Sequence, residues 1–144
     1  MTDSSLLQDF IVETGEHLEN TERNLLRLEP QARDAKVLNE IFRAIHTIKG
    51  SSEYLGLERI AELSHKLESL LDLVRRSERE LTTQVIDLLI DTNDRIAQLV
   101  DDLAQHEQEK AAINDVVARL EAMTGEAAPV SAEEAAAETF SGLD

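Results

Sequence analysis

Apolar residues recur along this chain at helical spacing, and polar residues fill the positions between them. Five stretches show this pattern, at residues 4–28, 34–55, 57–76, 82–103 and 109–123. Apolar side chains three and four residues apart lie on one face of a helix, so each stretch has a stripe that can be buried. The pattern therefore predicts an all-α fold.

Residues that start or stop helices mark the limits of these stretches. Pro30 ends the first helix, because the residue before a proline disfavours helical backbone. Asp34 and Thr82 are suitable N-caps, and Gly56 and Gly125 are suitable C-terminal stops. Four long helices with short connections favour an antiparallel up-down four-helix bundle, with an additional fifth helix at the C-terminal end.

The character of the sequence changes after the fifth helix. Residues 125–144 are rich in Ala and Glu and hold no Lys or Arg. Such a stretch buries too little apolar surface to offset its chain entropy. We expect one domain at residues 1–124, followed by a disordered acidic tail or interdomain linker at 125–144. A linker to further domains is the favoured interpretation, and a native acidic tail stays open.

Composition narrows the classes of partner. The 144 residues include 14 Lys and Arg against 30 Asp and Glu, a formal net charge of −16, which argues against nucleic-acid binding. The chain has no cysteine, no signal peptide at its N-terminus and no apolar run near the roughly 20 residues that span a bilayer. We expect a cytoplasmic protein with no membrane insertion, monomeric as an isolated domain.

One histidine on the second predicted helix stands apart from the apolar stripe. That stripe includes Ile41, Ile45 and Ile48, and His46 points away from it. Lys49 and Gly50 follow at +3 and +4, which places them beside the imidazole on the same surface. The sequence thus predicts an exposed histidine.

The two neighbours of this histidine are informative in different ways. A glycine within a helix costs about 1 kcal/mol relative to alanine, so Gly50 calls for an explanation. Close helix packing is one explanation, and the approach of a partner molecule is the favoured one. Lys49 is useful if His46 acquires negative charge, as a phosphohistidine does, although a solvated surface lysine is the simpler interpretation.

A second pair, His65 and Glu68, lies on the third predicted helix at a spacing of three residues. If the second and third helices pack antiparallel, this pair can meet His46. A carboxylate accepting the Nδ1 proton of His46 would leave Nε2 free as the nucleophile. An ordinary surface glutamate is the alternative. We assign no function to His17 or His106.

These residues resemble a known family. The signature of histidine phosphotransfer domains is similar to HTIKGSSEYLG at residues 46–56. The flanking runs, IFRAI at 41–45 and SHKLESLLD at 64–72, resemble the N-terminal phosphotransfer domain of chemotaxis histidine kinases of the CheA type. The similarity covers residues 5–123 and implies a four-helix bundle with an appended fifth helix.

The resemblance also implies roles for the site residues. His46 would be phosphorylated at Nε2, Glu68 would hold its Nδ1, Lys49 would stabilise the phosphoryl group, and His65 would complete the hydrogen-bond network. Gly50 would leave room for a docking partner. The other docking residues implied are Ser51, Arg43 and Phe42.

The partners implied are two protein domains. A kinase ATP-binding domain would supply the phosphoryl group from ATP, and a response-regulator receiver domain would accept it on an aspartate. The chain has no glycine-rich phosphate loop, so ATP and Mg would be bound by the kinase domain, and no cofactor or metal is expected here. The chain would then be the phospho-accepting fragment of a histidine kinase.

Three alternatives remain. Ser51–Tyr54 also suits a free-standing phosphotransfer protein of a multistep phosphorelay. Glu62 and His65 have the spacing found in di-iron helical bundles, although those need the motif twice. A helical bundle with a purely structural interaction role is the third, and it explains neither Gly50 nor an exposed His46.

Overall fold

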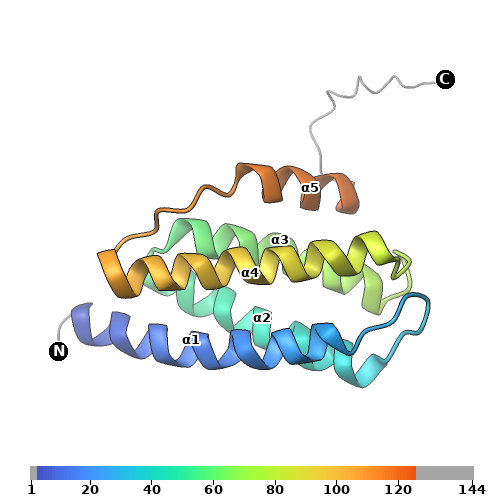
Figure 1. The fold of residues 1–144 in the computed structure, drawn as a ribbon, viewed down its shortest axis with the longest axis horizontal. Helices are drawn as coiled ribbons and strands as arrows, with labels where there is room; N and C mark the ends of the chain where they lie inside the picture. The colour runs from blue at the N-terminus through green and yellow to red at the C-terminus, as the bar shows by residue number, and fades with distance from the viewer. Residues whose placement is uncertain (1–2, 126–144) are drawn as a thin grey trace.

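Residues 3–125 are described by a computed structural model, and in this range the chain forms five α-helices without β-strands (Figure 1). The helices are α1 (Asp3–Leu26), α2 (Ala35–Leu55), α3 (Glu58–Arg75), α4 (Thr83–His106) and α5 (Asn114–Thr124). Contacts join α1 to α2 and α4, and α3 to α2 and α4, so the first four helices close into a bundle. The shorter α5 packs across α3 and α4. The predicted fold class is confirmed, while residues 126–144 of the predicted tail lie outside the described residues.

The core consists of the stripes predicted from the sequence. The inward residues are almost all Leu, Ile and Val, and each fully buried one stabilises the fold by about 2 kcal/mol of transfer free energy. The largest fully buried side chains include Leu25, Leu38, Ile41, Ile45, Ile48, Ile60, Leu63, Leu67, Leu70 and Leu71. In the described range, no helix is both long enough and apolar enough to cross a membrane.

Local residues begin and end α2, as the sequence predicts. The side chain of Asp34 accepts a hydrogen bond from the backbone N–H of Val37 at 3.2 Å. Gly56 ends the helix with a φ of 74°, a left-handed conformation that a residue with a Cβ adopts only with strain. Thr82 caps α4 in the same way as Asp34, accepting from the N–H of Val85 at 3.1 Å. These predicted boundaries are confirmed.

Remote residues contribute hydrogen bonds at both ends of α3. The carboxylate of Glu109 accepts hydrogen bonds from the backbone N–H groups of Arg59 at 3.0 Å and Ile60 at 2.7 Å. At the other end, the guanidinium of Arg33 donates to the carbonyl of Arg75 at 2.8 Å. An anion at the N-terminus and a cation at the C-terminus both complement the helix dipole. The connection between α1 and α2 and the connection between α4 and α5 therefore both help to hold α3.

The role of Glu109 explains why the predicted start of the fifth helix is wrong. That helix was expected from residue 109, whereas α5 begins at Asn114. The carboxylate of Asp102 accepts hydrogen bonds from the N–H groups of Lys110 at 2.9 Å and Ala111 at 2.8 Å. These N–H groups and the Glu109 side chain are thus committed to tertiary contacts, and the segment before α5 stays irregular.

Candidate functional site

His46 lies on the outer surface of α2, as predicted. Its side chain is 63% exposed, whereas its neighbours Ile45 and Ile48 are buried in the core. The stripe of buried residues fixes the rotation of α2 and so directs the imidazole into solvent. The exposure of His46 follows from the packing of the helix that bears it.

One carboxylate, that of Glu68, joins His46 to Lys49. Glu68 projects from α3, which packs against α2, and its Oε2 is hydrogen-bonded to Nδ1 of His46. Its Oε1 accepts a hydrogen bond from Nζ of Lys49 at 2.8 Å. A carboxylate accepts only, so Nδ1 carries the proton and Nε2 presents a lone pair. The structure brings His46, Lys49 and Glu68 together.

The environment keeps Glu68 ionised. Burial raises the pKa of its carboxyl, but hydrogen bonds and charge from Lys49 and His46 outweigh burial and lower the pKa below its usual value of 4.5. The carboxylate is only 13% exposed. A shielded anion is therefore fixed behind the exposed imidazole, where it can hold the Nδ1 proton and stabilise positive charge on the ring.

A groove of about 460 Å³ surrounds this trio. Phe42 and Arg43, predicted as docking residues, both line it. The Phe42 ring is stacked with the His46 imidazole, with centroids 6.3 Å apart and planes at 11°. The guanidinium of Arg75 lies over the Phe42 ring, 3.7 Å from its centroid. Phe42 thus packs beside the His46 imidazole as well as lining the groove around it.

The remaining predicted docking residues line a neighbouring groove. Gly50 and Ser51 lie with Tyr54 in a groove of about 420 Å³ between α1 and α2. A Cβ placed on Gly50 would meet no atom within 4 Å, so helix packing in the described part of the chain does not require a glycine there. Tyr54 is 80% exposed. The open surface beside His46 favours the approach of a partner as the explanation for Gly50.

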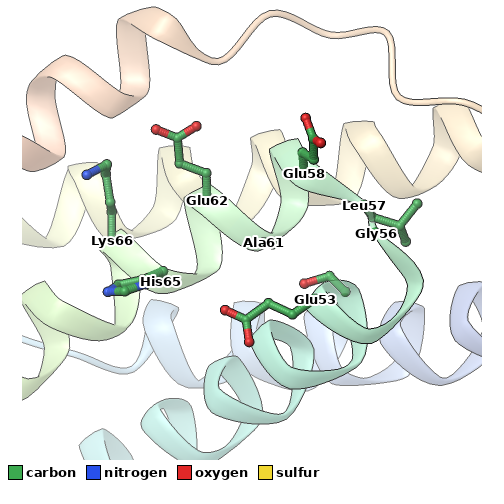
Figure 2. Close-up of a pocket in the computed structure, with 9 residues that line it drawn as sticks. Glu53, Gly56, Leu57, Glu58, Ala61, Glu62, His65 and Lys66 are labelled. Carbon is green, nitrogen blue, oxygen red and sulfur yellow. The ribbon is translucent and has the colours of Figure 1, made fainter.

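His65 lies elsewhere. Its exposed side chain lines a third groove, of about 410 Å³, that also includes Glu53, Glu62 and Lys66 (Figure 2). In the described range no hydrogen bond joins the His65 imidazole to His46 or its two partners. Glu68 turns toward α2, whereas His65, nearly one turn earlier on α3, stays in solvent. The structure does not bring His65 into the expected network.

The described part of the chain offers no further ligands for a di-iron site. In the described range no group of three or more His, Asp, Glu or Cys side chains is arranged to hold a metal ion. Glu62 and His65 are both exposed rather than inward-facing. Within residues 3–125, Glu62 and His65 therefore have no second ligand pair with which to form a di-iron site.

Sequence reasoning missed Arg75. Its guanidinium donates to Asp72 Oδ1 at 2.8 Å and to Asn39 Oδ1 at 3.0 Å, in addition to its contact with Phe42. The spacing of Asp72 and Arg75 on one helix is a weak signal of pairing. The contacts with Asn39 and Phe42 cross from α3 to α2, so the sequence pattern of a single helix contains no sign of them.

Comparison with known proteins shows the family to which this chain belongs. Residues 5–109 match the Hpt domain family. The chain belongs to this family. It is 35% identical over 120 residues to the chemotaxis protein CheA of Listeria monocytogenes, covering 83% of this chain and 19% of that protein. It is 40% identical over 114 residues to CheA of Klebsiella aerogenes, covering 79% of this chain and 18% of that protein. The chain thus spans under a fifth of these relatives.

Solved structures share the fold. The CheA phosphotransferase domain from Thermotoga maritima is 36% identical, with a TM-score of 0.67, covering 72% of this chain and 99% of that one. The solution structure of a histidine phosphotransfer domain of CheA is 32% identical, with a TM-score of 0.73, covering 85% and 92%. The phosphorylated P1 domain of CheA3 from R. sphaeroides, solved in complex with CheY6, has a TM-score of 0.76 at 22% identity, covering 88% and 100%, which shows the fold alone.

Proposed function

We propose that this chain is the phosphoryl carrier of a chemotaxis-type two-component pathway, with the phosphoryl group on Nε2 of His46. One observation carries the proposal. An exposed imidazole has its Nδ1 proton held by an ionised carboxylate, and that carboxylate is paired with a lysine on the same surface. Only Nε2 is then both nucleophilic and accessible.

The transfer would proceed in two steps, each of which uses the residues around His46. The Nε2 lone pair attacks the γ-phosphorus of ATP, the Nε2–P bond forms, and the bond to the ADP oxygen breaks. The ring becomes cationic, and Glu68 stabilises it through the Nδ1–H hydrogen bond. Lys49 supplies positive charge beside the phosphoryl oxygens. A receiver aspartate oxygen then attacks phosphorus, the P–Nε2 bond breaks, and the imidazole returns to its neutral form.

The partners follow from the same chemistry. ATP and Mg would be bound by a separate kinase domain, and the acceptor would be a receiver domain resembling CheY or CheB, all in the cytoplasm. Support comes from the curated CheA relatives and from the similarly folded CheA3 domain that was solved with CheY6. The same relatives favour a kinase-associated domain over a free-standing relay protein, and the domain would act as a monomer.

The test is phosphorylation by radiolabelled ATP and the kinase domain of a CheA-type protein. The chain is expected to acquire label that is labile in acid and stable in alkali, as a phosphohistidine is. His46→Gln should abolish labelling while leaving the helix content unchanged. The matched control is His106→Gln, which removes another exposed histidine at the end of α4 and should label as the parent chain does. Labelling retained in His46→Gln would contradict the proposal.

A further inference from the structure

The guanidinium of Arg75 is fixed in place by three contacts. It donates to Asn39 Oδ1 on α2 and to Asp72 Oδ1 on α3, and it lies 3.7 Å from the centroid of the Phe42 ring. A planar guanidinium can satisfy two acceptors and stack on a ring at the same time. Arg75 therefore holds the Phe42 ring against α3.

Phe42 in turn contacts the reactive histidine. It lies one turn before His46 on α2, and the two rings are nearly parallel at 11° with centroids 6.3 Å apart, within the range of offset stacking. The hydrogen bond to Glu68 holds the imidazole at one atom, Nδ1, and does not by itself fix the plane of the ring against small turns. A parallel neighbour restricts this turning and so limits the directions in which Nε2 can point.

We propose that Arg75 is a positioning residue for phosphoryl transfer, acting through Phe42 on the plane of the His46 imidazole. The inference rests on the proposed function, because it concerns the direction from which Nε2 meets phosphorus. In-line attack depends strongly on orientation, so an imidazole that turns more freely reacts more slowly even when its Nδ1 partner is intact.

The chain offers a matched control in the adjacent arginine. Arg76 also pairs with Asp72, at 3.1 Å, and with Glu78 at 3.2 Å, and its side chain is 55% exposed. Its ion pairs are with these two carboxylates rather than with groups on α2. Arg75→Gln and Arg76→Gln therefore make the same change in charge and residue type at adjacent positions, the last residue of α3 and its C-cap.

Two measurements separate a positioning role from a structural one. By NMR without ATP, Arg75→Gln should shift the His46 ring-proton signals, because the ring-current effect of Phe42 changes, whereas Arg76→Gln should leave them at their original positions. With ATP and the kinase domain, Arg75→Gln should be phosphorylated about fivefold more slowly, and Arg76→Gln at the parental rate. Circular dichroism should show equal helix content in both.

A third variant tests the route of the effect. Phe42→Leu should slow phosphorylation by a similar factor, and combining it with Arg75→Gln should add little, because both changes remove one linkage. Unshifted His46 signals in Arg75→Gln, equal rates for the two arginine variants, or fully additive effects in the double variant would each overturn the inference. Failure of the proposed function would differ, since the parent chain itself would then take no label on His46.

Discussion

The two helices that build the site, α2 and α3, are held in different ways. The ends of α2 are local: Asp34 caps its start and Gly56 its end. At the start of α3, Leu57 offers no side-chain cap, and Glu109 from the segment before α5 supplies the hydrogen bonds instead. At the end of α3, Arg33 from the connection between α1 and α2 donates to the carbonyl of Arg75, and the N–H of Arg76 supplies a local backbone hydrogen bond as well.

The difference matches the roles of the two helices. The proposed nucleophile, His46, is on α2, where exposure follows from the pattern of one helix. The group that orients it, Glu68, is on α3, where position depends on the assembled bundle. In the proposed function, α2 supplies the imidazole that reacts. The packing of α3 against α2 places the carboxylate that holds this imidazole.

The largest expected effect is on the contact between the two helices. Glu68→Ala should slow phosphorylation of His46 about 30-fold, equivalent to ~2 kcal/mol, because a charged hydrogen bond to Nδ1 is lost. Binding to the kinase domain should be preserved. Rates measured with radiolabelled ATP check this, with Glu62→Ala as the exposed control on the same helix. An unchanged rate in Glu68→Ala would remove this residue from the mechanism.

The next largest effect is on the remote cap of α3. Glu109→Ala should lower the free energy of unfolding by about 1.5 kcal/mol, because two N–H groups at the start of α3 lose a charged acceptor. Chemical denaturation measures this loss, and hydrogen exchange should locate it in the first turn of α3. Gln108→Ala, an exposed neighbour, is the control. Equal stability of the two variants would show that α3 does not depend on this remote cap.

A smaller effect is expected at the local cap of α2. Asp34→Ala should lower the free energy of unfolding by about 1 kcal/mol, since a single side-chain hydrogen bond to the N–H of Val37 is lost. Faster hydrogen exchange should be confined to the first turn of α2. Exchange that increased equally in α2 and α3 would remove the distinction between a locally held and a remotely held helix.

The smallest effect is on the acid dependence of stability. The pKa of Glu68 is lowered in the folded state, so the unfolded chain binds a proton first as pH falls. Its contribution to stability is present above pH 4.5 and is lost as pH falls through the lower folded pKa. Glu68→Gln should therefore lose less stability than the parent chain between neutral and acidic pH. Denaturation curves at several pH values measure this, and identical acid dependence would contradict it.

Much of the site is predictable because it depends on single helices. The stripe through Ile41 and Ile45 placed His46 on the surface, and antiparallel packing was enough to bring Glu68 to it. Caps such as Asp34 are local signals and were also predictable. Each of these features needs only the period of a helix and the chemistry of its ends.

The remaining features depend on contacts between distant segments. The carboxylate of Glu109 contacts α3 only in the assembled bundle. The helical pattern after Glu109 therefore predicted too early a start for α5. The stacking of Arg75 on Phe42 also joins two helices. For His65 the sequence predicted a contact that the structure does not show. Its imidazole is near Glu68 in sequence but lines a different groove and does not join the hydrogen-bond network of His46. Register and rotamer across an interface decide such contacts.

NMR of the phosphorylated chain directly tests whether Nε2 of His46 is the atom that carries the phosphoryl group. Phosphorus–nitrogen and proton–nitrogen correlations distinguish phosphate on Nε2 from phosphate on Nδ1. With Nδ1 hydrogen-bonded to Glu68, the phosphoryl group is predicted on Nε2 of His46, with a proton retained on Nδ1. A phosphoryl group on Nδ1, or on any residue other than His46, would contradict the account.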